Sequence, residues 1–144
     1  MNLKTFKALV RVKKQAMQRC EADIASNLAK IHAKYEEQQG LVSDLNTLSV
    51  PTQANMAAFS QCNSLKKNYL YAIDQVGLEI SELKAIDTHL KELYKNACIE
   101  YEKLQYLYTL ELRKMAQKLE KEEAKQMDAI GAEVFYQKQK ARRA

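Results

Sequence analysis

The 144 residues are enough for one domain and too few to expect two. Three glycines and one proline leave few turns for a β-sheet, while alanine, leucine, lysine, glutamate and glutamine favour helix. A charged fraction of 28% without tryptophan suits an elongated helical assembly better than a compact globule. The sequence contains neither a run suited to a transmembrane helix nor a secretory signal, so we expect cytoplasmic residence.

The net charge of +5 is unevenly distributed along the chain. Residues 1–20 contain six basic side chains and residues 134–144 contain four, and neither stretch contains an acidic one. Of the 23 basic residues, 13 remain for the middle, against 18 acidic ones. Both ends are therefore positive around a negative middle, which would suit an acidic protein surface, an anionic membrane or nucleic acid.

The first predicted element is a helix over about residues 3–48. Its apolar residues follow one another mostly at intervals of three, four or seven, which is typical of a coiled-coil seam. They are Leu3, Phe6, Val10, Met17, Cys20, Ile24, Leu28, Ile31, Tyr35, Val42, Leu45 and Leu48. Gly40 interrupts this helix and weakens it by about 1 kcal/mol relative to alanine.

The sole proline, Pro51, predicts a break between two helices. Proline lacks a backbone donor and disfavours helix at the preceding residue. We expect a hinge at about residues 49–55, with Ser49 or Thr52 capping the helix that follows.

The second predicted helix covers about residues 56–138 and has the longer seam. Every step in this seam is three or four residues: Tyr69, Ile73, Val76, Ile80, Leu83, Asp87, Leu90, Tyr94, Ala97, Tyr101, Leu104 and Tyr108. Two helices joined by one tight break pack as antiparallel neighbours. The expected fold is therefore all-α: a single coiled-coil domain over residues 1–144, in which two long helices form an antiparallel hairpin and the second overhangs.

The expected register follows from a turn centred near residue 52. Facing residues then have numbers that sum to about 104, which places Ile24 beside Ile80 and brings Lys13 within about one turn of Asp87. On this register the first helix ends level with about Tyr101. The remainder of the second helix needs a packed apolar face, so we expect another protein to cover it.

Patterns of catalytic or metal-binding residues are missing from the sequence. The two histidines, His32 and His89, have no nucleophile or metal ligand at a useful spacing, and the three cysteines are widely separated. The carboxylates of Glu120, Glu122 and Glu123 alternate with lysines, as on a solvated helix face. We therefore expect neither an enzyme nor a bound cofactor or metal.

Both ends of the chain resemble the FliJ family, the small coiled-coil component of bacterial flagellar type III export. The resemblance rests on the apolar and basic opening at residues 3–14, LKTFKALVRVKK, and on residues 123–130, EAKQMDAI, which basic residues follow. It implies a stalk similar to the central stalk of rotary ATPases, which binds the flagellar export ATPase ring and the export-gate membrane protein and escorts export chaperones. It also implies a cytoplasmic protein that lies peripherally at the cytoplasmic face of the inner membrane through its partners.

The expected partner-binding residues come from three places. The resemblance points to Leu3, Phe6 and Arg11 in the first helix and to Gln126, Asp128 and Ile130 in the second. The overhang adds three leucines: Leu104, Leu107 and Leu110. The alternative function is a generic self-associating structural coiled coil, or the peripheral stalk of another ATPase. Sequence-specific DNA binding is disfavoured because the basic residues of the N-terminus are interleaved with apolar ones.

Overall fold

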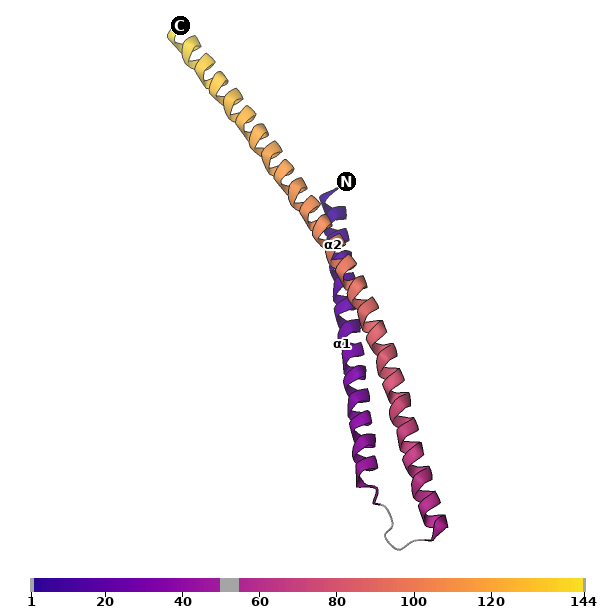
Figure 1. Ribbon diagram of the computed structural model, residues 1–144. Coiled ribbons are helices and arrows are strands. Elements are labelled where there is room, and N and C mark those ends of the chain that lie inside the picture. The colour runs from indigo at the N-terminus through magenta and orange to yellow at the C-terminus, as the bar shows by residue number, and fades with distance from the viewer. Residues whose placement is uncertain (1, 50–54, 144) are drawn as a thin grey trace. The chain divides into compact units, whose positions relative to one another are not determined.

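The computed structural model describes residues 2–49 and 55–143, of which 97% are helical (Figure 1). Helix α1 spans Leu3–Thr47 and helix α2 spans Met56–Arg143, beyond the expected end near residue 138. The described part of the chain contains no strand, and the two helices pack against each other. The predicted all-α hairpin is confirmed. Of the expected hinge at residues 49–55, residues 50–54, including Pro51 and Thr52, lie outside the described ranges.

Both helices begin at an asparagine cap. The Asn2 side-chain oxygen accepts a hydrogen bond from the Lys4 backbone N–H at 3.2 Å, and that of Asn55 accepts one from the Ala58 N–H at 3.0 Å. A capping side chain satisfies an N–H group that the first turn leaves free. The sequence-based choice of Ser49 or Thr52 as the cap of α2 was wrong, because the cap must directly precede the first helical turn.

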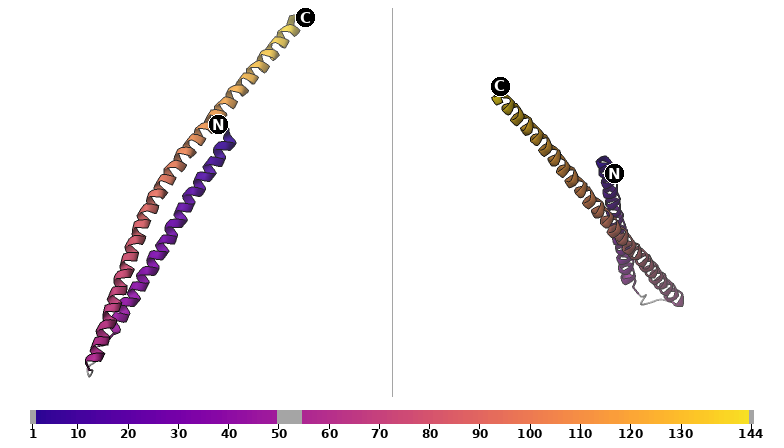
Figure 2. Two further views of the ribbon diagram at one scale, coloured as in Figure 1. Left: turned by 90° about the vertical axis from the view of Figure 1, so that its right-hand side faces the viewer. Right: turned by 90° about the horizontal axis from the view of Figure 1, so that it is seen from above.

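The contacts between residues divide the chain into two compact units. The hairpin unit comprises Gln15–Cys98, and the terminal unit comprises Met1–Lys14 with Ile99–Ala144. In the hairpin unit, α1 and α2 run side by side in opposite directions (Figures 1 and 2). The boundary between the units crosses α2 after Cys98.

The seam of α2 is the one that the sequence predicts. All twelve predicted positions, Tyr69 to Tyr108, are buried or half-buried, and Val76 and Ile80 are the most enclosed. Their spacing follows the 3.5-residue repeat that keeps one helix face against a partner.

The seam of α1 differs from the prediction at three positions. Leu28, Tyr35 and Val42 lie on an exposed flank, and Leu28 keeps 48% of its surface accessible. The neighbouring core-facing positions are occupied by Asn27, Lys34 and Leu41, of which the first two are polar. Asn27 is only 5% exposed. Buried polar groups of this kind specify register at some cost in stability.

The register of the hairpin unit is shifted from the expected one. Asn27 Nδ2 donates to the Leu83 carbonyl oxygen at 2.9 Å, and Lys34 Nζ lies 2.7 Å from Glu79 Oε2. The paired residue numbers sum to 110 and 113 instead of about 104. The Cys62 thiol lies 4.0 Å from the Ser49 carbonyl oxygen, so the first turn and a half of α2 extends beyond the end of α1.

The expected proximity of Lys13 and Asp87 was therefore wrong. Lys13 Nζ pairs with Glu100 Oε2 at 2.7 Å, and Asp87 Oδ2 pairs with Lys91 Nζ at 3.0 Å, one turn along the same helix. The other Asp87 oxygen is buried without a hydrogen-bond partner among the described residues. A carboxylate in this seam costs stability, because burial removes its water without supplying a full set of donors.

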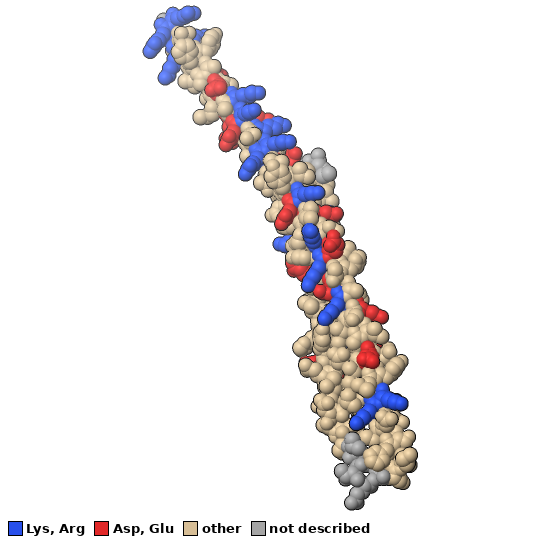
Figure 3. Space-filling view, viewed as in Figure 1, with Lys and Arg blue, Asp and Glu red and all other residues tan. Residues whose placement is uncertain are grey.

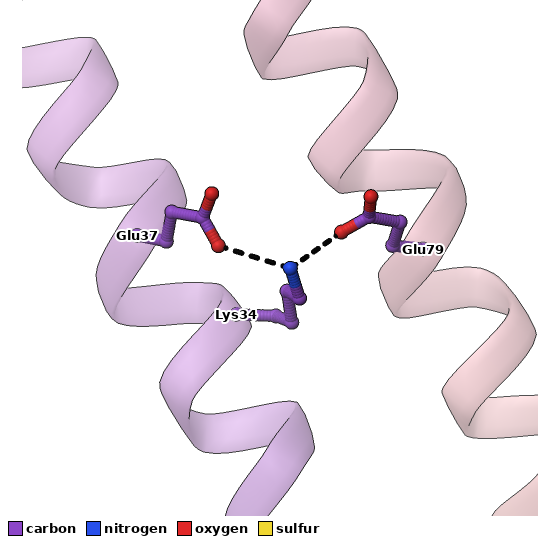
Figure 4. Close-up of polar contacts among 3 residues, drawn as sticks. All are labelled: Lys34, Glu37 and Glu79. Carbon is purple, nitrogen blue, oxygen red and sulfur yellow. Dashed lines mark hydrogen bonds and ion pairs between the residues drawn. The ribbon is translucent and has the colours of Figure 1, made fainter.

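One lysine bridges the two helices of the hairpin unit. The Lys34 ammonium lies between the Glu37 carboxylate of α1, at 3.1 Å, and the Glu79 carboxylate of α2, at 2.7 Å (Figure 4). The hydrogen bond to Glu79, followed by that to Glu37, raises the pKa of Lys34 above its ordinary 10.5. The group is open to solvent, so it defines the register more than it stabilises the fold.

Candidate partner-binding surface

The first turns of α1 cover a stretch of α2 in the terminal unit. Phe6 is 9% exposed and Leu3 is half-buried. The ion pair of Lys13 with Glu100 sets the antiparallel register there. Counting back from this pair places Phe6 level with about residue 107 of α2 and Leu3 level with about residue 110.

The cover that α1 provides ends near Glu111. Leu104 and Leu110 are half-buried, and all described residues from Leu112 onward are exposed. The overhang therefore begins near Leu112 and not near Tyr101, because the true register carries α1 further along α2. Residues 112–143, the uncovered segment, extend over about 48 Å at 1.5 Å per residue.

Large apolar side chains are exposed throughout the uncovered segment, and Ile130 keeps 59% of its surface accessible. They are Leu112, Met115, Leu119, Met127, Ile130, Val134, Phe135 and Tyr136. A long helix gains most of its stability from a packed apolar face, and contiguous exposed apolar surface marks an interaction site. The uncovered segment is the candidate binding surface.

The nine predicted binding residues fall into different environments. Four of them are buried or half-buried where α1 packs against α2: Leu3, Phe6, Leu104 and Leu110. Arg11 and Leu107 are exposed beside them.

Three predicted residues, Gln126, Asp128 and Ile130, belong to the uncovered segment and are exposed. Gln126 lies about 24 Å beyond Leu110 along the helix axis. The structure therefore does not bring the start of α1 opposite residues 126–130. The nine predicted residues do not include Leu112, Leu119, Met127 or Val134. These four are separated by seven or eight residues, which places them on one helix face.

The end of α2 carries a cluster of positive charge. Figure 3 shows lysine and arginine side chains gathered there, and the last turn contains Lys140, Arg142 and Arg143. Positive charge in a last turn also complements the helix dipole. Near α1, the hydrogen bond from Lys13 and its charge hold the pKa of Glu100 below its ordinary 4.5.

Neither a metal site nor a membrane span is found among the described residues. Their histidines, cysteines and carboxylates form no group of three suited to a metal ion. None of the described helical segments is both long and apolar enough to cross a membrane.

The fold and this surface define a class: an antiparallel helical-hairpin protein whose second helix presents an uncovered apolar face. The family described as "Flagellar FliJ protein" matches residues 2–140. The chain belongs to the FliJ family, and the resemblance seen in the sequence is confirmed. It is therefore a protein associated with flagellar export, in a family that serves as a structural component of that apparatus. Comparisons with curated proteins and with solved structures give no match.

Proposed function

We propose that this chain is a non-enzymatic coiled-coil stalk that binds the flagellar export ATPase ring and the export gate and escorts export chaperones. The observation that carries the proposal is the uncovered segment of a FliJ-family chain, which exposes apolar side chains along 32 residues of α2. Association with the export apparatus is what the family implies, and an exposed apolar helix face is what a binding stalk requires.

Charge supports a partner with an acidic surface. Val134 to Arg143 contains four basic residues and no acidic one. The described contacts include no ion pair that neutralises Lys138, Lys140, Arg142 or Arg143. A positive helix end of this kind complements the acidic lumen of a ring.

Affinity capture with the full chain tests the proposal. The tagged chain is incubated with a lysate of its native host, and retained proteins are identified by mass spectrometry. We expect the flagellar export ATPase, an export-gate component and export chaperones. Retention of none of the three contradicts the proposal, and the purified components then establish which interactions are direct.

A second function, self-association into a structural coiled coil, is favoured by the same exposed apolar residues. Sedimentation velocity separates the two. We expect the chain to remain mainly monomeric at micromolar concentration, since the surface is assigned to a partner. A stable dimer that hides the uncovered segment would favour self-association instead.

A further inference from the structure

One face of the uncovered segment is apolar except at its centre. Six exposed apolar residues follow one another along this face, which we call the stripe: Leu112, Met115, Leu119, Met127, Ile130 and Val134. Each step is three or four residues, except for a gap of eight between Leu119 and Met127. Glu123 lies four residues from both and fills that gap. The stripe therefore contains one carboxylate between two apolar halves.

Glu123 has no basic neighbour on its own helix face. The residues three or four positions away are Leu119, Glu120, Gln126 and Met127. By contrast, the adjacent Glu122 has Lys118 and Lys125 at those distances. Among the described residues, no ion pair involves Glu123. Its charge is thus available to a group from outside the chain.

The surface is hollowed at this carboxylate. A shallow depression of about 300 Å³ is lined by Glu123, Gln126, Met127 and Ile130. Two of these residues were already predicted to bind a partner. The depression combines apolar walls with one carboxylate and one amide, a setting that suits a long side chain with an apolar stem and a cationic end.

A second copy of the chain is a poor occupant of the stripe. In a parallel dimer in register, each Glu123 faces the other. In an antiparallel dimer with full overlap, Leu112 meets Val134, and the midpoint of the stripe is again residue 123. Both symmetric pairings bring two carboxylates together, and like charges at an interface oppose association.

We propose that the stripe binds an amphipathic helix of another protein, and that this helix carries a lysine or arginine between two apolar turns to pair with Glu123. Two apolar halves around one charge fix the axial position of the partner helix, because a shift by one heptad separates the ions. The inference rests on the proposed function only in taking the uncovered segment as the binding surface.

A synthetic helix tests this complementarity without any component of the export apparatus. The probe is a fluorescent peptide of residues 109–137 of this chain with Glu123→Lys, and the reference peptide keeps Glu123. Binding of each to the full wild-type chain is measured by anisotropy. Because residue 123 is central, a cation meets Glu123 whether the peptide binds parallel or antiparallel.

We expect the Glu123→Lys peptide to bind the wild-type chain on the order of tenfold more tightly than the reference peptide. The full chain with Glu123→Lys should reverse this preference. The matched control chain, Glu122→Lys, changes the same charge beside the stripe and should keep the wild-type preference. Equal binding of both peptides, or the same reversal with Glu122→Lys, overturns the inference. Either result would leave the proposed function standing, because the peptide assay contains no component of the export apparatus.

Discussion

Replacing Asn27 by alanine should destabilise the hairpin unit by about 1 kcal/mol. The side chain is 5% exposed, and its amide donates to the Leu83 carbonyl oxygen at 2.9 Å. Loss of such a hydrogen bond costs about 1 kcal/mol net, and the space left by the amide costs a similar amount. The higher helix propensity of alanine returns about 0.6 kcal/mol. The balance is a net loss.

Urea unfolding, followed by far-UV circular dichroism, measures this loss: the urea concentration at the midpoint of unfolding should fall, while the dependence of the unfolding free energy on urea stays unchanged. Asn96→Ala is the matched control, because Asn96 is exposed on α2 and is not among the hydrogen-bonded side chains described. The Asn96→Ala variant should gain only the higher helix propensity of alanine and become slightly more stable. If both variants shift the midpoint equally, Asn27 does not hold the two helices together as described.

Two further predictions concern titratable side chains that lie where the helices meet. Hydrogen bonds with Cys98 and then with Glu21 raise the pKa of Tyr94 from 10.0 to about 12, so ultraviolet titration should show one of the eight tyrosines ionising late. Because the pKa of Tyr94 is raised, the stabilisation that its neutral hydroxyl contributes to the fold is complete below pH 10 and is lost as pH approaches 12. A late step that persists in Tyr94→Phe would refute the assignment. Lys13→Gln should raise the lowered pKa of Glu100 toward 4.5, as followed by carboxyl NMR. With its pKa lowered, Glu100 contributes stability above pH 4.5 that is lost as pH falls through its folded-state pKa, so an unchanged titration in Lys13→Gln would show that the ion pair is absent in solution.

The sequence predicted the seam of α2 correctly and that of α1 only in part. In α2 the apolar residues and Asp87 leave one consistent set of positions spaced by three and four. In α1, Ile24 and Ile31 are compatible with either Leu28 or Asn27 between them, and hydrophobicity favours Leu28. The structure places Asn27 inside, because its amide reaches a carbonyl of α2. Only the partner helix distinguishes these two choices.

The register was mispredicted because the sequence does not reveal how the chain leaves α1. A turn centred near Pro51 assumes that equal lengths of both helices face each other. The contact between Ser49 and Cys62 shows that α2 starts further out. The pair of Lys13 with Glu100 sums to 113, nine more than expected, which carries Leu3 from level with about residue 101 to level with about residue 110. The exposed overhang therefore begins at Leu112. Leu104 and Leu110 consequently lie under α1, and the exposed surface begins beyond them.

The most direct test of the central claim compares Ile130→Asp with Ala132→Asp in the full chain. Both substitutions add one carboxylate to an exposed position of the uncovered segment, but only Ile130 lies on the stripe. Affinity for the purified flagellar export ATPase is measured by isothermal titration calorimetry. Burying a carboxylate at an apolar interface costs a few kcal/mol, so Ile130→Asp should weaken binding by about 100-fold while Ala132→Asp leaves it nearly unchanged. Equal affinities of both variants and the wild-type chain would contradict the assignment of this surface.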